Sequence, residues 1–256
     1  MNIGKFIDFI IAKIRILKQQ KVFLYRDYKI KYILEKNVST DLIVIFSACT
    51  RKGIKARYNY MNTLKDIKCN KLFILDDYGD DARGVYYLGK QGDFSLAKGV
   101  SELIKQIYVK LDAKTKIYIG SSKGGYAALY FGLKDGADFV IAGAPQYNLG
   151  NFVNDQGGYH ILKYICGDIS EKSVNQLNGL LKNEIENACK SKIPKVYLHY
   201  SKNEFTYAEH IIDLKNYLNL KEISYEENIA YYSNHSEISV YFPKYLKFTL
   251  NSLFAK

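Results

Sequence analysis

Hydrophobic residues in this chain fall into short runs separated by turn residues and by longer segments with helical spacing. Near the start, the runs 21–25 and 29–34 flank Arg26-Asp27, which predicts a hairpin of antiparallel strands. Further short apolar runs without alternation are typical of strands buried on both faces of a parallel sheet. We expect such strands at 42–46, 71–75, 116–119, 138–142, 195–199 and 222–225.

Longer stretches between these strands carry apolar residues at helical spacing. The clearest is 94–111, and further helices are expected at 126–133, at 207–218 and after His235. A hairpin followed by alternating strands and helices predicts an α/β protein with the α/β-hydrolase fold, whose central sheet is mostly parallel. The 256 residues fit one such domain. The polar and irregular stretch 145–192 is predicted to be an insertion that forms a lid above the carboxyl ends of the strands.

One segment carries a motif with a chemical meaning. Residues 120–124 fit the pattern G-x-S-x-G with Ser122 at the centre, between a predicted strand and a predicted helix. A serine on such a tight turn needs glycine on either side, here Gly120 and Gly124, so that its hydroxyl projects from the turn. The motif therefore predicts a nucleophile elbow, and a glycine-rich turn without catalytic function is the alternative.

Hydrolases of this fold present an acid and then a histidine after the nucleophile. Glu204 is the only carboxylate in the loop 200–206 that follows a predicted strand, and we expect it to orient the histidine. A solvated loop glutamate is the alternative, with Asp213 as the next candidate acid. His235 follows the last predicted strand, whereas the other histidines precede the acid or lie inside a strand or a helix. His235 is therefore the predicted general base.

An oxyanion hole is expected to draw one backbone amide from Lys123, the residue after the nucleophile. The second amide should come from the loop after 42–46, where Ser47, Ala48 and Cys49 are the candidates, and we select Ala48. Ser47 and Arg51 on the same loop are predicted to contact substrate. The side chains of Lys123 and Arg51 are candidates for binding an anionic group, with ordinary solvation as the alternative.

Aromatic residues are frequent in the predicted lid. Tyr147 and Tyr159, together with Phe152 and Tyr164, could stack on sugar rings of a substrate. Packing within the lid is the alternative role for most of them. We select Tyr147 and Tyr159 as the predicted substrate-binding residues.

The formal net charge of +11 favours anionic partners. Its lysines are dispersed, and no helix-turn-helix, zinc-finger or RNA-recognition motif is present, so we do not expect nucleic-acid binding. Phosphate-bearing cofactors and acidic polysaccharides fit the same excess of positive charge.

Cellular context can be inferred from the cysteines and the N-terminus. The cysteines are scattered without C-x-x-C spacing, so we expect no metal site and a cytoplasmic location. Residues 3–17 predict an amphipathic helix that is neither a signal peptide nor a membrane span. Such a helix either packs on the protein's own sheet or attaches the protein peripherally to the inner membrane.

Several of these motifs together resemble a known family. YIGSSKGGYAALY at 118–130, DDYG at 76–79, YYLG at 86–89 and NHS at 234–236 resemble capsular polysaccharide biosynthesis proteins of the XcbB/CpsF type, over about 43–242. The resemblance implies an α/β-hydrolase fold and serine-dependent O-acetyl transfer from acetyl-CoA, as acyl donor, to a glycan. The sequence departs from the usual pattern in having glutamate rather than aspartate as the acid.

The residues and the resemblance together predict an acyltransferase of bacterial surface-polysaccharide synthesis. Ser122 would attack acetyl-CoA, and an anionic capsular polysaccharide would accept the acetyl group, with the capsule assembly machinery as a further partner. A carbohydrate or acyl esterase with the same Ser-Glu-His set is the first alternative. A non-catalytic module of the biosynthetic assembly that keeps the fold is the second.

Overall fold

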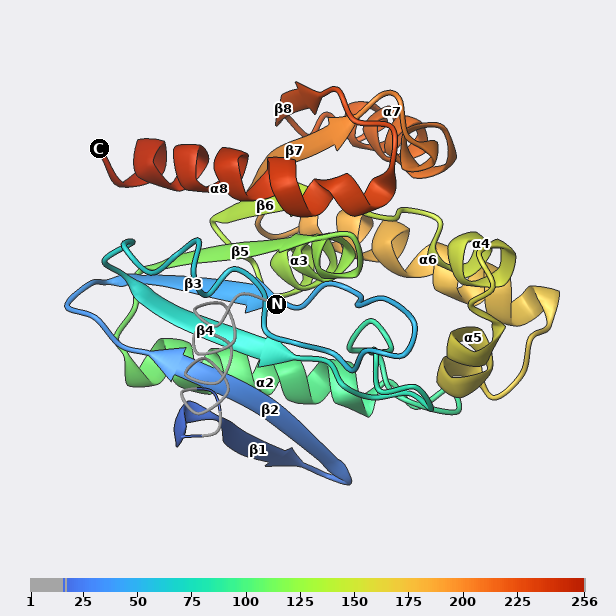
Figure 1. The fold of residues 1–256 in the computed structure, drawn as a ribbon, viewed down its shortest axis with the longest axis horizontal. Helices are drawn as coiled ribbons and strands as arrows, with labels where there is room; N and C mark the ends of the chain where they lie inside the picture. Colours follow the sequence, from blue (N-terminus) through green and yellow to red (C-terminus); the bar gives the residue numbers. More distant parts are fainter. Residues whose placement is uncertain (1–15, 17, 256) are drawn as a thin grey trace, which may run out of the picture.

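The computed structural model describes residue 16 and residues 18–255, and its centre is an eight-stranded sheet (Figure 1). The amphipathic helix predicted at 3–17 lies outside the described residues, apart from residue 16. Among the described residues, no helix has the length and apolar character needed to cross a bilayer. The strands are β1 (Lys21–Tyr25), β2 (Tyr28–Glu35), β3 (Asp41–Phe46), β4 (Asn70–Leu75), β5 (Thr115–Ser121), β6 (Phe139–Gly143), β7 (Lys195–Ser201) and β8 (Tyr225–Ala230).

The strand order is β1-β2-β4-β3-β5-β6-β7-β8. β1 and β2 form the predicted antiparallel hairpin, and β2 also runs antiparallel to β4. All remaining pairs are parallel, so the carboxyl ends of six strands point to one edge of the sheet. This arrangement confirms the predicted mostly parallel sheet with an N-terminal hairpin. β8 starts later than predicted because Glu222 has a positive φ of 54° and the Ile223 amide still donates to a carbonyl of the preceding helix.

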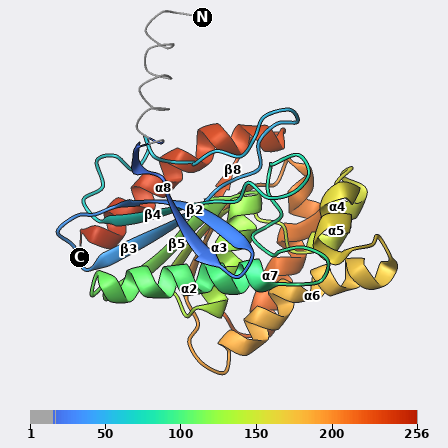
Figure 2. The ribbon, with the colours of Figure 1, turned by 90° about the horizontal axis from the view of Figure 1, so that it is seen from below.

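Helices cover both faces of the sheet, because its parallel strands are apolar on both sides. Figure 2 shows α2 on one side of the strands and α8 on the other. α2, α3, α6 and α7 share one hydrophobic core with the sheet, and α8 packs with the loop after β3 on the opposite face. The bounds of these helices are α2 (Ser95–Lys110), α3 (Lys123–Lys134), α6 (Glu171–Ala188), α7 (Ile212–Leu220) and α8 (Ile238–Phe254).

The predicted lid, residues 145–192, is helical rather than irregular. It forms α4 (Leu149–Asp155), α5 (Tyr159–Cys166) and α6, and α4 and α5 lie beyond the end of the sheet to which the arrowheads of β3 and β4 point (Figure 1). Leu177, Leu181 and Ile185 of α6 recur at every fourth position and are buried. The polar residues between them make this helix hard to recognise in the sequence. α4 and α6 touch so closely that a Cβ on Gly150 would lie 2.0 Å from a backbone oxygen of α6.

Candidate active site

The turn between β5 and α3 presents Ser122 in a strained conformation. Ser122 has φ 52° and ψ −124°, a region that side-chain-bearing residues rarely adopt, and its amide donates to the Gly143 carbonyl at 2.8 Å. The positions two residues before and after it must be glycines, because a Cβ on Gly120 would lie 2.1 Å from the Gly124 carbonyl oxygen. A Cβ on Gly124 would lie 2.6 Å from the Phe46 carbonyl oxygen. The geometry is that of a nucleophile elbow.

Three segments far apart in the sequence bring the predicted triad residues together. His235 Nε2 lies 2.9 Å from Ser122 Oγ, and His235 Nδ1 lies 2.8 Å from Glu204 Oε2. Ser122 follows β5, Glu204 follows β7 and His235 follows β8, so all three stand at the carboxyl edge of the parallel strands. With Nδ1–H donating to the carboxylate, Nε2 is left free to accept the proton of the serine hydroxyl.

The carboxylate of Glu204 is fully buried and both of its oxygens have partners. Oε2 faces His235, and Oε1 accepts a hydrogen bond from the Thr206 hydroxyl at 2.6 Å. The alternative acid Asp213 is instead bound by the side-chain amide of Asn148 at 2.8 Å. The structure therefore places Glu204, and not Asp213, beside the histidine.

Local structure holds His235 in place. Asn234 begins a short turn with a capping box, in which its side chain accepts from the Ser236 amide and Glu237 accepts from the Asn234 amide. Burial lowers the pKa of the neighbouring His210 to about 4, so this imidazole is neutral and adds no positive charge beside His235.

Lys123 does not offer its side chain to a ligand. Its ammonium is 1% exposed, lies 2.9 Å from the buried Asp76 carboxylate and sits 5.3 Å from the centre of the Tyr87 ring. Asp76 also accepts from the Val85 and Tyr87 amides, which fixes the segment after β4. The expectation that the Lys123 ammonium meets an anionic group of a ligand does not hold. Its amide lies in the first turn of α3, and its role in an oxyanion hole remains a prediction.

In the loop after β3, two backbone amides that were candidates for the oxyanion hole already have hydrogen-bond partners within the protein. The Ser47 amide donates to the Tyr87 hydroxyl at 2.6 Å and the Ala48 amide donates to Asn59 Oδ1 at 2.9 Å. The Ser47 side chain is buried and bonded to the same tyrosine, so the expectation that it contacts substrate does not hold. Ala48 would have to release Asn59 to serve an oxyanion hole. Arg51 is exposed on this loop, and its role in binding remains a prediction.

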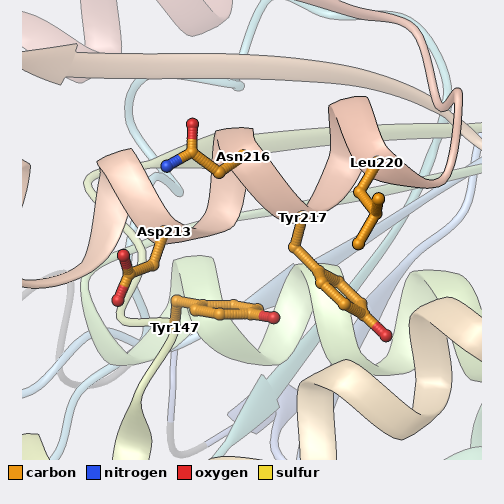
Figure 3. Close-up of a pocket in the computed structure, with 5 residues that line it drawn as sticks. All are labelled: Tyr147, Asp213, Asn216, Tyr217 and Leu220. Carbon is orange, nitrogen blue, oxygen red and sulfur yellow. The ribbon is translucent and has the colours of Figure 1, made fainter.

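The two lid tyrosines lie in different environments. Tyr147 is buried against Tyr217 with ring centres 6.2 Å apart. It lines an open pocket of about 240 Å³ together with Asp213, Asn216 and Leu220 of α7 (Figure 3). Tyr159 begins α5 and is half exposed. A role in sugar binding remains a prediction for both.

Sequence reasoning missed Gln146 and Phe205 next to the triad, and it did not anticipate the contact of Phe152 with Phe205. Gln146 is fully buried and places Nε2 3.5 Å from Ser122 Oγ. The Phe205 ring lies 5.5 Å from the His235 ring, and Phe152 of α4 stacks on Phe205 at 6.4 Å. The position of Gln146, just after β6 at the ligand-binding edge of the sheet, was the available signal. In the described part of the chain, no group of three or more His, Cys, Asp or Glu side chains is suited to a metal ion.

No protein-family model matches the chain, and no curated protein matches it either. Among solved structures, the capsule O-acetyltransferase of Neisseria meningitidis serogroup A aligns with 92% of this chain and 99% of its own, with 23% identity and a TM-score of 0.76. A histidine-to-alanine mutant of that enzyme in complex with CoA aligns with 90% of this chain and 94% of its own, with 24% identity and a TM-score of 0.73. The fluorophosphonate-binding serine hydrolase FphF of Staphylococcus aureus aligns with 91% of this chain and 97% of its own, with 13% identity and a TM-score of 0.63. These likenesses, together with the strand order, show that the chain has the α/β-hydrolase fold.

Proposed function

We propose that this chain is a serine-dependent O-acetyltransferase that moves an acetyl group from acetyl-CoA to a hydroxyl of a bacterial capsular or surface polysaccharide. The observation that carries the proposal is the continuous relay from Ser122 through His235 to the buried carboxylate of Glu204. Such a relay makes a serine hydroxyl nucleophilic and has no evident structural purpose at a strained turn.

In the first half of the proposed reaction, Ser122 Oγ attacks the thioester carbonyl carbon while His235 Nε2 takes the hydroxyl proton. Glu204 stabilises the imidazolium that forms. Collapse of the adduct breaks the carbon–sulfur bond, and the CoA thiol leaves with the proton from His235. The products are CoA and acetyl-Ser122.

In the second half, His235 removes a proton from the acceptor hydroxyl as that oxygen attacks the acetyl carbon. The bond to Ser122 Oγ breaks, and His235 returns the proton to the serine. The acceptor leaves as an acetyl ester. One base therefore serves both halves, because its hydrogen bond to Glu204 keeps the same nitrogen facing the reacting oxygen.

The donor and acceptor are supported by the comparisons rather than by the triad. The Neisseria meningitidis enzyme is a capsule O-acetyltransferase, and its mutant is solved in complex with CoA. The net charge of +11 fits both an anionic donor and an anionic glycan. We propose that the donor is acetyl-CoA and the acceptor a polysaccharide on these grounds.

We propose that the helices of residues 145–192 act as a lid that excludes water from acetyl-Ser122. Phe152 of α4 stacks on Phe205, which in turn contacts His235, so the lid packs next to the general base. Phe152→Ala should raise the ratio of free acetate to acetylated glycan. Ile169→Ala, an exposed change in the same segment, is the control and should leave the ratio unchanged. An unchanged ratio in Phe152→Ala would contradict the lid role.

The test of the proposed function is to incubate the protein with acetyl-CoA, with and without candidate glycans, and to follow free CoA and the mass of the glycan. We expect CoA release that depends on a glycan, with one acetyl mass added to it. Ser122→Ala should abolish both. Rapid CoA release that is indifferent to any glycan would support the esterase alternative, and no reaction of any kind would support the non-catalytic module.

A further inference from the structure

Gln146 stands out among the buried polar side chains of the site. It is fully buried, its Oε1 has no hydrogen-bond partner among the described residues, and the partner of its Nε2 is the nucleophile oxygen, 3.5 Å away. A buried amide with an unpaired oxygen costs free energy, so such a group is expected where a ligand completes its bonding. The amide points at the reacting atom.

The orientation of the Gln146 amide follows from the triad. The Ser122 proton is directed to His235 Nε2, so the remaining lone pairs of Oγ accept hydrogen bonds. An amide oxygen at that place would compete with His235 for the same proton. The NH₂ group of Gln146 therefore faces Ser122, and it is a donor pointed at the place where an acyl group binds.

Two of the three candidate amides for the second oxyanion donor are occupied in this protein. The Ser47 and Ala48 amides of the loop after β3 already donate to Tyr87 and Asn59. The Lys123 amide stands in the first turn of α3, where backbone N–H groups have no partner within the helix. One backbone donor is thus in place and a second donor is required.

We propose that Gln146 is a catalytic residue whose Nε2–H supplies this second donor and stabilises the oxyanion formed on Ser122. The inference rests on the proposed serine chemistry and names a new residue within it. When Ser122 Oγ bonds to the carbonyl carbon, the oxygen that gains the negative charge is bonded to that same carbon, two bonds from Oγ. A donor that is 3.5 Å from Oγ can then lie within about 2.7–3.1 Å of the oxyanion. Gln146 transfers no proton and serves both halves of the reaction equally.

The test uses Gln146→Met and Gln146→Glu in the full chain, with p-nitrophenyl acetate as substrate and a trifluoromethyl ketone as inhibitor. The ketone adds to the serine and carries an oxyanion, so it measures the proposed contact without turnover. Each variant should lose roughly 10²–10³ in kcat with KM nearly unchanged, because removal of one oxyanion donor has this size of effect. The affinity for the ketone should fall by a similar factor. Gln176→Met, on an exposed position of α6, is the matched control and should match the wild type.

Two outcomes would overturn the inference. A loss confined to KM, or ketone affinity within about threefold of the wild type, would overturn it, because the amide would then contact only the ground state. If Gln146→Met fails to fold, the near-isosteric Gln146→Glu gives the same readout. The assay needs neither CoA nor a glycan, so failure of glycan acetylation with an intact effect of Gln146 would refute the proposed acceptor and keep this inference.

Discussion

Replacing Glu204 with glutamine isolates the electrostatic part of the proposed relay. The change keeps the size of the side chain and removes its charge. Glu204 is buried, its Oε2 lies 2.8 Å from His235 Nδ1, and its Oε1 is held by Thr206. Water therefore cannot replace the missing charge when the imidazolium forms. The variant should fold normally but react slowly.

The size of the effect follows from Coulomb's law. Two unit charges about 4 Å apart in an effective dielectric constant of about 20 attract each other by about 4 kcal/mol. About 1.4 kcal/mol of transition-state stabilisation corresponds to a tenfold change in rate, so this loss is worth roughly 10³-fold. A glutamine that presents its NH₂ group to Nδ1 also favours the wrong tautomer of His235. We therefore expect kcat to fall by roughly 10³–10⁴-fold.

The assay is release of p-nitrophenol or CoA under saturating substrate, with circular dichroism to verify the fold. Two matched controls lie on the same segment. Glu209→Gln removes a half-exposed carboxylate, and Asn203→Ala removes an exposed amide next to Glu204. Both should retain most of the activity. A kcat for Glu204→Gln within tenfold of the wild type would refute the relay and place the acid elsewhere.

Three further predictions concern the elbow and its support. Ser122→Ala should lose about 10⁴-fold or more in kcat while Ser121→Ala stays active, and the reverse result in a rate assay would overturn the motif assignment. Lys123→Met should lower the free energy of unfolding, measured with urea, by about 3–5 kcal/mol, because it leaves the buried Asp76 carboxylate without its counter-ion. A decrease of less than about 1 kcal/mol would show that the pair is not buried in solution. Gly120→Ala should give no soluble protein, since its Cβ would clash with a backbone oxygen, and a folded, active variant in an expression and rate assay would contradict the tight turn.

Local patterns in the sequence were sufficient to predict the sheet and the proposed triad. The strands from β3 to β7 are mostly apolar, and the order of strands and helices then fixes where the loops after β5, β7 and β8 meet. β8 is more polar, and its start was predicted too early. Ser122 is predictable because its turn requires glycines at fixed spacing. Glu204 and His235 are predictable because each is the only suitable group in the loop where the fold needs it.

The remaining features depend on contacts between distant residues. Nothing near Lys123 in the sequence indicates that its ammonium turns inward to Asp76, 47 residues away. The bonds of Ser47 to Tyr87 likewise join separate loops. The role of Gln146 is hidden for the same reason, because its place against the nucleophile follows from the packing of β5 beside β6.

The central claim is that Ser122 carries the acetyl group between donor and acceptor. The most direct measurement is mass spectrometry of peptides from protein that is mixed with acetyl-CoA and quenched in acid within milliseconds to seconds. The account predicts one added acetyl group on the peptide that contains Ser122, and its loss when a glycan acceptor is added before the quench. Acetylated glycan formed while Ser122 never carries an acetyl group, or an acetyl group found only on another residue, would contradict the account.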